Sequence, residues 1–290
     1  CIRDRTGATG EFGKHVVKQL IEKDVKTSGI SVLSRSEKKA NIFKADGITV
    51  KIGDYTNYDS LVKAFEGVDK LLFVSSSEIE NRAAQHQNVV KAAKATGVRH
   101  IVYTSFMRNQ ERDDSAIAFL QDSHLKTENW IKESGMTYTF LQNATYLDML
   151  PMFIGEQVLE TGVIMQPAQN GKSSLVLRQE LAEAAAAVLT SEGHENKTYP
   201  LVNNQAISYN EVAESIAQIS GKDITYQSPS PEEYQATLKT YGIPDEYIGL
   251  FTAFSVAQAN GELEMSDNSL EKLIGRKPTT AKEFLTKIYA

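Results

Sequence analysis

The sequence predicts an α/β fold: a doubly wound parallel sheet followed by a smaller C-terminal α+β lobe. Short apolar runs alternate with helix-length segments up to about residue 145, and several of these runs end in small or polar residues. Near the start, three glycines are spaced as G-x-x-G-x-x-G. Strands separated by helices pair in parallel, and ligands bind at the edge formed by their carboxyl ends.

The elements of the first half follow from the apolar pattern. Strands are predicted at 30–33, 48–52, 70–74, 100–104 and 138–141, and helices at 14–23, 37–45, 58–65, 82–96 and 120–134. A first strand should precede the glycines, but Cys1–Arg5 carries three charges in five residues. A central parallel strand is normally apolar, so we infer that this leader is not native, being a junction or a misread end, and we expect a weakened first strand.

After residue 145 the alternation is looser. Helices are predicted at 179–189, 208–220, 231–241 and 246–260, and strands at 198–202 and 224–227. Ser208 followed by Glu211 forms a capping-box pattern. We therefore expect a nucleotide-binding domain over residues 1–145 and a smaller lobe over 146–290 that returns elements to the edge of the sheet.

Composition excludes several classes of protein. The chain has 290 residues, 41% of them hydrophobic and 23% charged, as in an ordinary globular protein. A net charge of −6 without a basic block argues against nucleic-acid binding, and no apolar run approaches the roughly 20 residues of a membrane span. Cys1 is the only cysteine, and the histidines show no ligand spacing, so we expect no metal site and a cytoplasmic location.

The glycine stretch predicts a Rossmann-type dinucleotide site. Glycines let the backbone approach a pyrophosphate, and the N–H groups at the start of the following helix point at its charge. A flexible turn is the alternative interpretation. The residues expected to contact the cofactor here are Gly7, Ala8, Thr9, Gly10, Glu11, Phe12 and Gly13.

Three further strand ends add to this site. Arg35 follows the second strand, where a guanidinium accommodates the 2′-phosphate of NADP(H), although it could also be a solvated surface arginine. Asp54 follows the third strand and could bond the adenine amino group or simply form a turn. Ser75, Ser76 and Ser77 follow the fourth, where small residues let a cofactor lie against the backbone.

A catalytic acid is harder to find. None of the 12 tyrosines is followed four residues later by a lysine, so the usual Tyr-x-x-x-Lys pair of short-chain dehydrogenases is missing. His124 shares a helix face with Glu128 and is a candidate proton donor, with a half-buried packing histidine as the alternative. A quinone suits such a site, because its ring accepts hydride readily.

Several motifs together resemble the NmrA-like atypical short-chain dehydrogenase/reductases, in particular their quinone oxidoreductase branch and the related triphenylmethane reductases. The resemblance runs from about residue 6 to the C-terminus. It rests on Gly7-Ala8-Thr9-Gly10, Arg35, Gly53-Asp54-Tyr55, Ser75-Ser76-Ser77-Glu78, Tyr103-Thr104-Ser105, Gly193 to Tyr199, Ser220-Gly221-Lys222 and Lys272 to Gly275.

The resemblance implies NADPH as cofactor and adds residues to its site. These are Asn143, Ala144, Thr145 and Tyr146 after the sixth strand, and Arg178, which matches a family arginine near the cofactor cleft. The family often has arginine where this chain has Gln142, and a bulky aromatic residue near Thr145. These departures affect the nicotinamide side of the site and the shape of the substrate pocket.

The function expected is NADPH-dependent transfer of hydride to a quinone or another conjugated aromatic substrate. Reduction of triphenylmethane dyes is one alternative. The other is a binding protein that senses NADP(H) without chemistry, as some NmrA-like relatives do. We expect no membrane or nucleic-acid partner, and a homodimer is possible.

Overall fold

The computed structural model describes residues 3–5, 8, 10–109 and 114–290. Five parallel strands form its main sheet in the order β1-β4-β5-β6-β9. They are β1 (Arg3–Arg5), β4 (Lys70–Phe73), β5 (His100–Phe106), β6 (Thr137–Asn143) and β9 (Lys197–Leu201). A parallel pair, β2 (Ser31–Ser34) and β3 (Thr49–Ile52), lies with β2 beside β1. The predicted doubly wound α/β sheet is confirmed.

The first strand forms where the sequence places it. Arg3 pairs in parallel register with Lys70, and Arg5 with Leu72, so β1 is only three residues long. Cys1 and Ile2 lie outside the described residues. The backbone of Arg3–Arg5 therefore pairs with β4 in the main sheet despite the charged composition of this segment.

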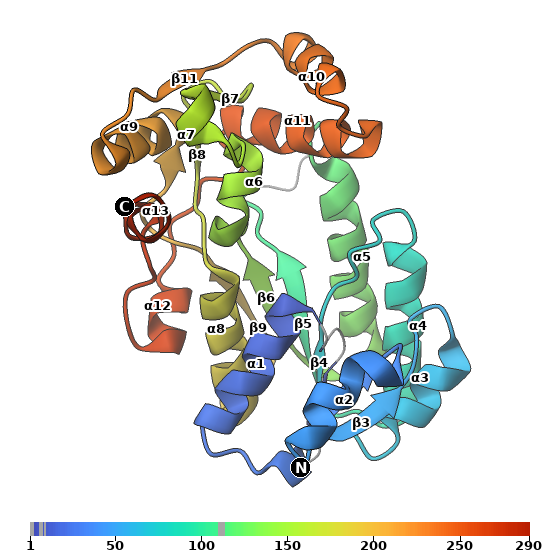
Figure 1. Cartoon of the computed structure of the whole chain (residues 1–290). Helices are drawn as coiled ribbons and strands as arrows, with labels where there is room; N and C mark the ends of the chain where they lie inside the picture. Colours follow the sequence, from blue (N-terminus) through green and yellow to red (C-terminus); the bar gives the residue numbers. More distant parts are fainter. Residues whose placement is uncertain (1–2, 6–7, 9, 110–113) are drawn as a thin grey trace.

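Helices cover both faces of the sheet (Figure 1). One face packs against α1 (Glu11–Glu22) and α8 (Arg178–Thr190), and the other against α3 (Tyr58–Phe65), α4 (Arg82–Ala95) and α5 (Ala118–Ser134). Within β4, Leu72 belongs to the first core, and Leu71 and Phe73 to the second. This alternation is the period-two pattern of a strand, and it explains why a strand covered on both faces is apolar throughout.

Most of the second half forms a lobe with its own core. Two short sheets, β7 with β11 in parallel and β8 with β10 antiparallel, are joined by helices. The lobe and its connections contain η2 (Leu147–Met149), α6 (Leu150–Ile154), α7 (Val158–Thr161), β7 (Val163–Met165), β8 (Lys172–Ser173), β10 (Ile207–Ser208), α9 (Tyr209–Ser220), β11 (Thr225–Gln227), α10 (Pro231–Thr240), α11 (Asp245–Ala259), α12 (Ser269–Ile274) and α13 (Ala281–Tyr289). The remaining elements are η1 (Thr27–Gly29) and α2 (Glu37–Ala45).

The predicted capping box at α9 is confirmed. The Ser208 hydroxyl accepts from the Glu211 N–H, and the Glu211 carboxylate accepts from the Ser208 N–H at 2.8 Å. The strand predicted at 198–202 also forms, as β9, and it extends the main sheet beside β6. None of the helices in the described ranges is both long and apolar enough to cross a bilayer.

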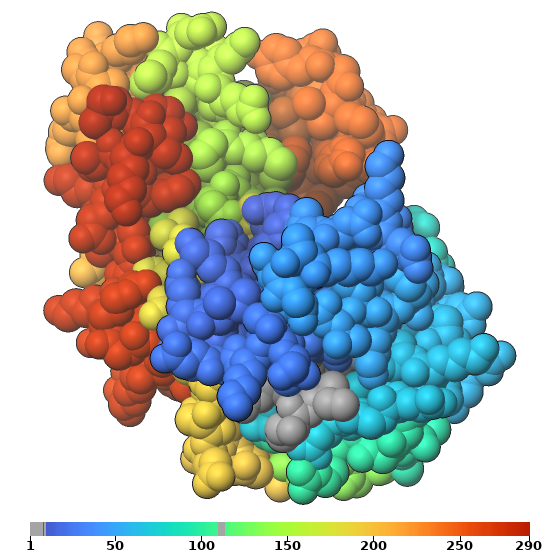
Figure 2. All heavy atoms as spheres, turned by 60° about the horizontal axis from the view of Figure 1, so that its bottom comes forward, coloured from blue at the N-terminus to red at the C-terminus, as the bar shows by residue number. Residues whose placement is uncertain are grey.

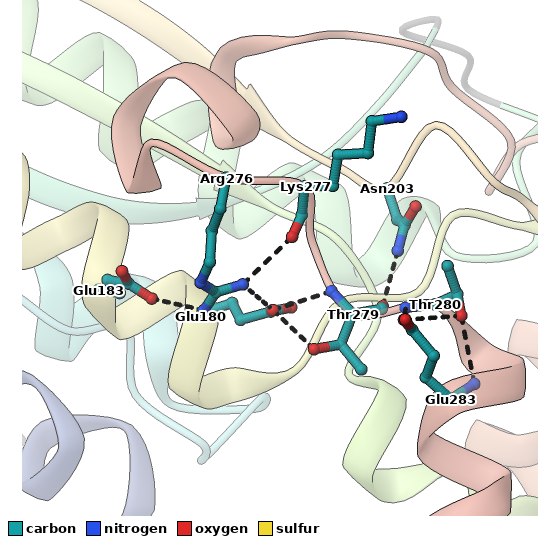
Figure 3. Close-up of polar contacts among 8 residues, drawn as sticks. All are labelled: Glu180, Glu183, Asn203, Arg276, Lys277, Thr279, Thr280 and Glu283. Atoms are coloured by element: carbon teal, nitrogen blue, oxygen red, sulfur yellow. Dashed lines mark hydrogen bonds and ion pairs between the residues drawn. The ribbon is translucent and has the colours of Figure 1, made fainter.

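The C-terminal segment lies along one side of the molecule, drawn in red in Figure 2 beside the N-terminal helices in blue. A polar cluster ties this segment to α8 (Figure 3). We call Glu180, Glu183, Arg276 and Thr279 the C-terminal clasp. Arg276 donates to Glu180 and to Glu183 at 2.7 Å each, and both the N–H and the hydroxyl of Thr279 donate to Glu180 at 2.8 Å. The clasp therefore anchors the helix that begins at Arg178.

Candidate active site

A cleft of ≈ 680 Å³ opens at the carboxyl ends of β2, β3 and β4. It brings together most of the residues predicted to bind a cofactor, although these come from segments far apart in the sequence. The predicted residues that line it are Gly10, Glu11, Phe12, Gly13, Arg35, Asp54, Ser75, Ser76, Ser77, Tyr146 and Arg178. Ala8 is fully buried nearby in sequence, and Gly7 and Thr9 lie outside the described residues.

The start of α1 has the features of an anion site. Gly10 precedes the helix in an extended conformation (φ −79°, ψ 165°), and no described side chain caps the first turn. The first N–H groups of a helix have no intrahelical partner, and the helix dipole makes this end positive. Because α1 begins at the wall of the cleft, these groups can serve a phosphate there.

An arginine and a glutamate face each other in the lining of the cleft. Arg35 Nη1 lies 3.2 Å from Glu78 Oε1, and the two side chains are 68% and 44% exposed. Asp54 stands beside them with its carboxylate accepting from the N–H and the hydroxyl of Thr56 at 2.8 Å each. Burial favours a raised pKa for Asp54, but the bonds from Thr56 outweigh it and lower the pKa. Asp54 thus forms a turn, and an adenine contact stays a prediction.

Two buried side chains of α4 bind the loop after β4 through the backbone N–H and carbonyl of Ser76. The Ser76 N–H donates to His86 Nε2 at 2.9 Å, and Arg82 Nε donates to the Ser76 carbonyl at 2.7 Å. His86 is fully buried, and burial lowers its pKa to about 3. The neutral ring accepts at Nε2, so its proton is on Nδ1, which contacts Thr127 Oγ1 at 2.8 Å. The loop that lines the cleft is therefore held in place by its hydrogen bonds to α4.

His124 lies in the core rather than at the cleft. It is 4% exposed, with Nδ1 at 2.7 Å from the Tyr103 hydroxyl and Nε2 at 3.4 Å from Arg82 Nη1. Burial, reinforced by the Arg82 charge, holds its pKa well below the ordinary value. This arrangement matches the packing alternative, and it gives no support to the predicted role of His124 as a proton donor.

A buried ion pair at the ends of β5 and β6 was missed by the sequence reasoning. Arg108 donates to both carboxylate oxygens of Glu128, at 3.0 and 2.7 Å, and Ser105 donates to the same group at 2.6 Å. Gln142 also reaches this carboxylate, at 3.4 Å. Although burial favours a raised pKa for Glu128, these bonds lower it. Arg108 thus supplies a guanidinium beside Gln142, where the family resemblance implies an arginine.

The stretch after β6 runs beneath the cleft and into a second, smaller cavity. Asn143 and Ala144 are buried and do not line the cleft. Thr145 and Tyr146 line the second cavity, whose free space is only ≈ 20 Å³, and Tyr146 also lines the cleft. Asn143 Oδ1 and Thr145 Oγ1 are buried and have no hydrogen-bond partner among the residues that the structure describes. Buried polar atoms are seldom left unpaired, so these two are candidates to bond a ligand.

Arg178 lines the cleft as predicted, but its charge is already paired. Its backbone N–H and its guanidinium both bond the carboxylate of Asp148, with the N–H at 3.0 Å from Oδ1. The guanidinium also lies over the ring of Tyr146, 5.6 Å from the centroid. Arg178 therefore orients Tyr146 between the two cavities.

A doubly wound sheet with an uncapped glycine-led helix at its carboxyl edge defines a Rossmann-type dinucleotide-binding protein. The model of the NmrA-like family matches residues 6–285, and the chain belongs to that family. The family membership inferred from the motifs is confirmed.

Known relatives cover the whole chain. Quinone oxidoreductase 2 of Escherichia coli (strain K12) is 38% identical over 98% of this chain and 97% of its own length. The crystal structure of the E. coli NADPH-dependent quinone oxidoreductase QOR2 complexed with NADPH superposes with a TM-score of 0.94, at 37% identity and full coverage of both chains. The Citrobacter sp. triphenylmethane reductase complexed with NADP(H) has a TM-score of 0.91 at 40% identity, covering 99% of this chain and 100% of the other.

Proposed function

We propose that this protein is an NADPH-dependent reductase that transfers hydride to a quinone. The observation that carries the proposal is the cleft itself, where the uncapped start of α1 and Arg35 line one continuous space. The full-length similarity to E. coli quinone oxidoreductase 2 supports the choice of acceptor.

In this proposal the chain binds NADPH along the carboxyl edge of the sheet. The Gly10–Gly13 stretch holds the pyrophosphate through backbone N–H groups, and Arg35 binds the 2′-phosphate through its fork of donors. Ser75 to Ser77 support the middle of the cofactor. Thr145, whose Oγ1 has no hydrogen-bond partner among the described residues, serves its nicotinamide end beside Tyr146, while contacts from Asn143 and Ala144 stay predictions. When bound, NADPH supplies the hydride, and one quinone and one proton are consumed for each hydroquinone formed.

The lobe over residues 146–290 provides the acceptor side, with residues 1–145 as the cofactor domain. The second cavity adjoins the cleft at Tyr146, and its walls include Leu150, Phe153 and Phe254. The ≈ 20 Å³ of free space in this cavity holds about one water molecule, so the acceptor ring is assigned to the cleft at Tyr146, where the neighbouring apolar and aromatic walls exclude water from the hydride path. The chain's part in the reaction is to position and desolvate the two reactants.

The test is oxidation of NADPH by the purified protein with a small benzoquinone. We expect consumption of NADPH well above the rate without protein, and a slower rate with NADH. A panel that includes a triphenylmethane dye separates the second candidate, which the similarity to triphenylmethane reductase favours. Tight binding of NADPH with no turnover of any acceptor would instead identify a sensor. Light scattering on the same sample determines whether a homodimer forms.

A further inference from the structure

The Arg35–Glu78 pair spans two walls of the cleft that are distant in sequence. Arg35 follows β2, and Glu78 belongs to the loop between β4 and α4. Both side chains line the cleft, and their charged atoms lie 3.2 Å apart. A ligand anion that binds Arg35 must therefore compete with this carboxylate.

The carboxylate is the fixed member of this pair. Glu78 Oε2 accepts from Gln85 Nε2 at 2.6 Å, and Gln85, on α4, is only 4% exposed. The Glu78 N–H donates to Ser76 Oγ at 3.2 Å, within the loop whose backbone is held by His86 and Arg82. Arg35, in contrast, has no second ion pair within the described part of the chain. Arg35 is free to turn, whereas Glu78 is held in place by buried groups.

We propose that Glu78 is a specificity-determining residue that weakens NADPH relative to NADH, an inference that rests on the proposed function. A 2′-phosphate must displace Glu78 from Arg35 and then remain close to a held carboxylate. Both costs are electrostatic and apply to the phosphorylated cofactor. The adenosine ribose of NADH carries a neutral 2′-hydroxyl, which can donate to a carboxylate. Glu78 therefore reduces the preference for NADPH over NADH that Arg35 creates.

The experiment compares Glu78→Gln with Glu80→Gln, which removes the same charge two residues further along. Glu80 is exposed in the same loop, so it controls for the change in net charge. The variants and the wild type are titrated with NADPH, NADH, 2′,5′-ADP and 5′-AMP. In Glu78→Gln the new amide oxygen can still accept from Gln85, so the loop keeps its contact with α4.

We expect Glu78→Gln to tighten NADPH and 2′,5′-ADP by about 3- to 10-fold, the range of a partly exposed charge interaction. NADH and 5′-AMP should be unchanged or slightly weaker, and Glu80→Gln should change every ligand by less than about 2-fold. A purely structural role for Glu78 would shift the phosphorylated and unphosphorylated ligands together.

Two results would overturn the inference. One is an equal effect of the two variants on NADPH, and the other is a Glu78→Gln variant whose NADPH to NADH ratio equals that of the wild type. Failure of the proposed function looks different, because the wild type would then bind neither nucleotide or would bind NADPH without reducing any acceptor.

Discussion

Two arginine–glutamate pairs stand near the same edge of the sheet, and they differ in almost every respect except composition. The side chains of Arg35 and Glu78 are 68% and 44% exposed and share one contact at 3.2 Å. Those of Arg108 and Glu128 are 10% and 4% exposed and share two, at 3.0 and 2.7 Å. The exposed pair can exchange its partner for a ligand, whereas the buried pair is a fixed part of the scaffold.

The two pairs differ in energy because their surroundings differ, although their charges are the same. An exposed ion pair contributes about 0–1 kcal/mol, because water competes for both groups. Removing one member of a buried pair costs about 3–5 kcal/mol, because a charge is left behind in a medium that solvates it poorly. Mutation of the exposed pair should therefore change ligand affinity, whereas mutation of the buried pair should change the free energy of unfolding.

The largest expected effect is the loss of stability in Glu128→Gln. The free energy of unfolding should fall by about 3 kcal/mol, since Arg108 loses the carboxylate that accepts from both of its Nη groups. Urea denaturation measures it. Glu133→Gln, on the exposed side of the same helix, is the matched control and should stay within about 0.5 kcal/mol. A loss below about 1 kcal/mol for Glu128→Gln would contradict the view that this pair is a fixed element.

The sequence predicted the sheet and its helices well because their signals are local. The predicted helix at 58–65 matches α3 at both ends, and the one at 120–134 begins only two residues after α5. Gly135 follows α5 in the left-handed conformation (φ 79°) that favours glycine. The strand predicted at 224–227 forms as β11, but its partner β7 and the pair β8–β10 were not predicted, because strands of two or three residues carry no readable period and depend on contacts across the lobe.

The site was predicted where the topology alone determines position. Arg35 and Ser75 directly follow two of the strands, and Gly10 follows the loop after the first strand. These residues line one cleft because the carboxyl ends of parallel strands share an edge of the sheet. Burial was not predictable in the same way. His124 and Glu128 are buried because their side of α5 faces the sheet, and Arg108, in the loop after β5, meets Glu128 from 20 residues away. Glu78 belongs to the Ser75-Ser76-Ser77-Glu78 motif, but its carboxylate contacts Arg35 and Gln85 only in the folded structure, so the sequence did not predict these contacts.

The next largest effect is expected from a substitution in the exposed pair of Arg35 and Glu78. Arg35→Asp should weaken NADPH by about 10- to 100-fold, which corresponds to the loss of about 1.5–3 kcal/mol from charge-assisted hydrogen bonds. NADH should change by less than about 3-fold, and the free energy of unfolding by less than about 1 kcal/mol. Fluorescence titration and urea denaturation supply the two readouts.

Lys38→Asp is the control for the change in charge, because Lys38 is exposed on α2 and does not line the cleft. It should leave the NADPH to NADH ratio nearly unchanged. Equal losses of both cofactors in Arg35→Asp would show that the guanidinium does not select the 2′-phosphate, and a large loss of stability would contradict the contrast between the two pairs.

The smallest effect comes from a buried histidine at the amino end of β5, away from the cleft. His100 is 7% exposed and lies 2.8 Å from Thr139 Oγ1, and burial, aided by the charge of Lys70, lowers its pKa from 6.5 to about 4. Because the unfolded chain then binds the proton more readily, stability is complete above pH 6.5 and falls as the pH drops toward 4. Between about pH 6.5 and 5.5 this group accounts for about 1 kcal/mol of loss.

His100→Gln should remove that part of the pH dependence, because a glutamine does not titrate but can still donate to Thr139. The comparison is the difference in unfolding free energy between wild type and variant at the two pH values, with NADPH affinity measured beside it. Parallel stability profiles would show that His100 titrates normally. His100 is at the opposite end of its strand from the cleft. An NADPH affinity that changed with the substitution would therefore mean that the sheet transmits the change in the core to Arg35 and Glu78.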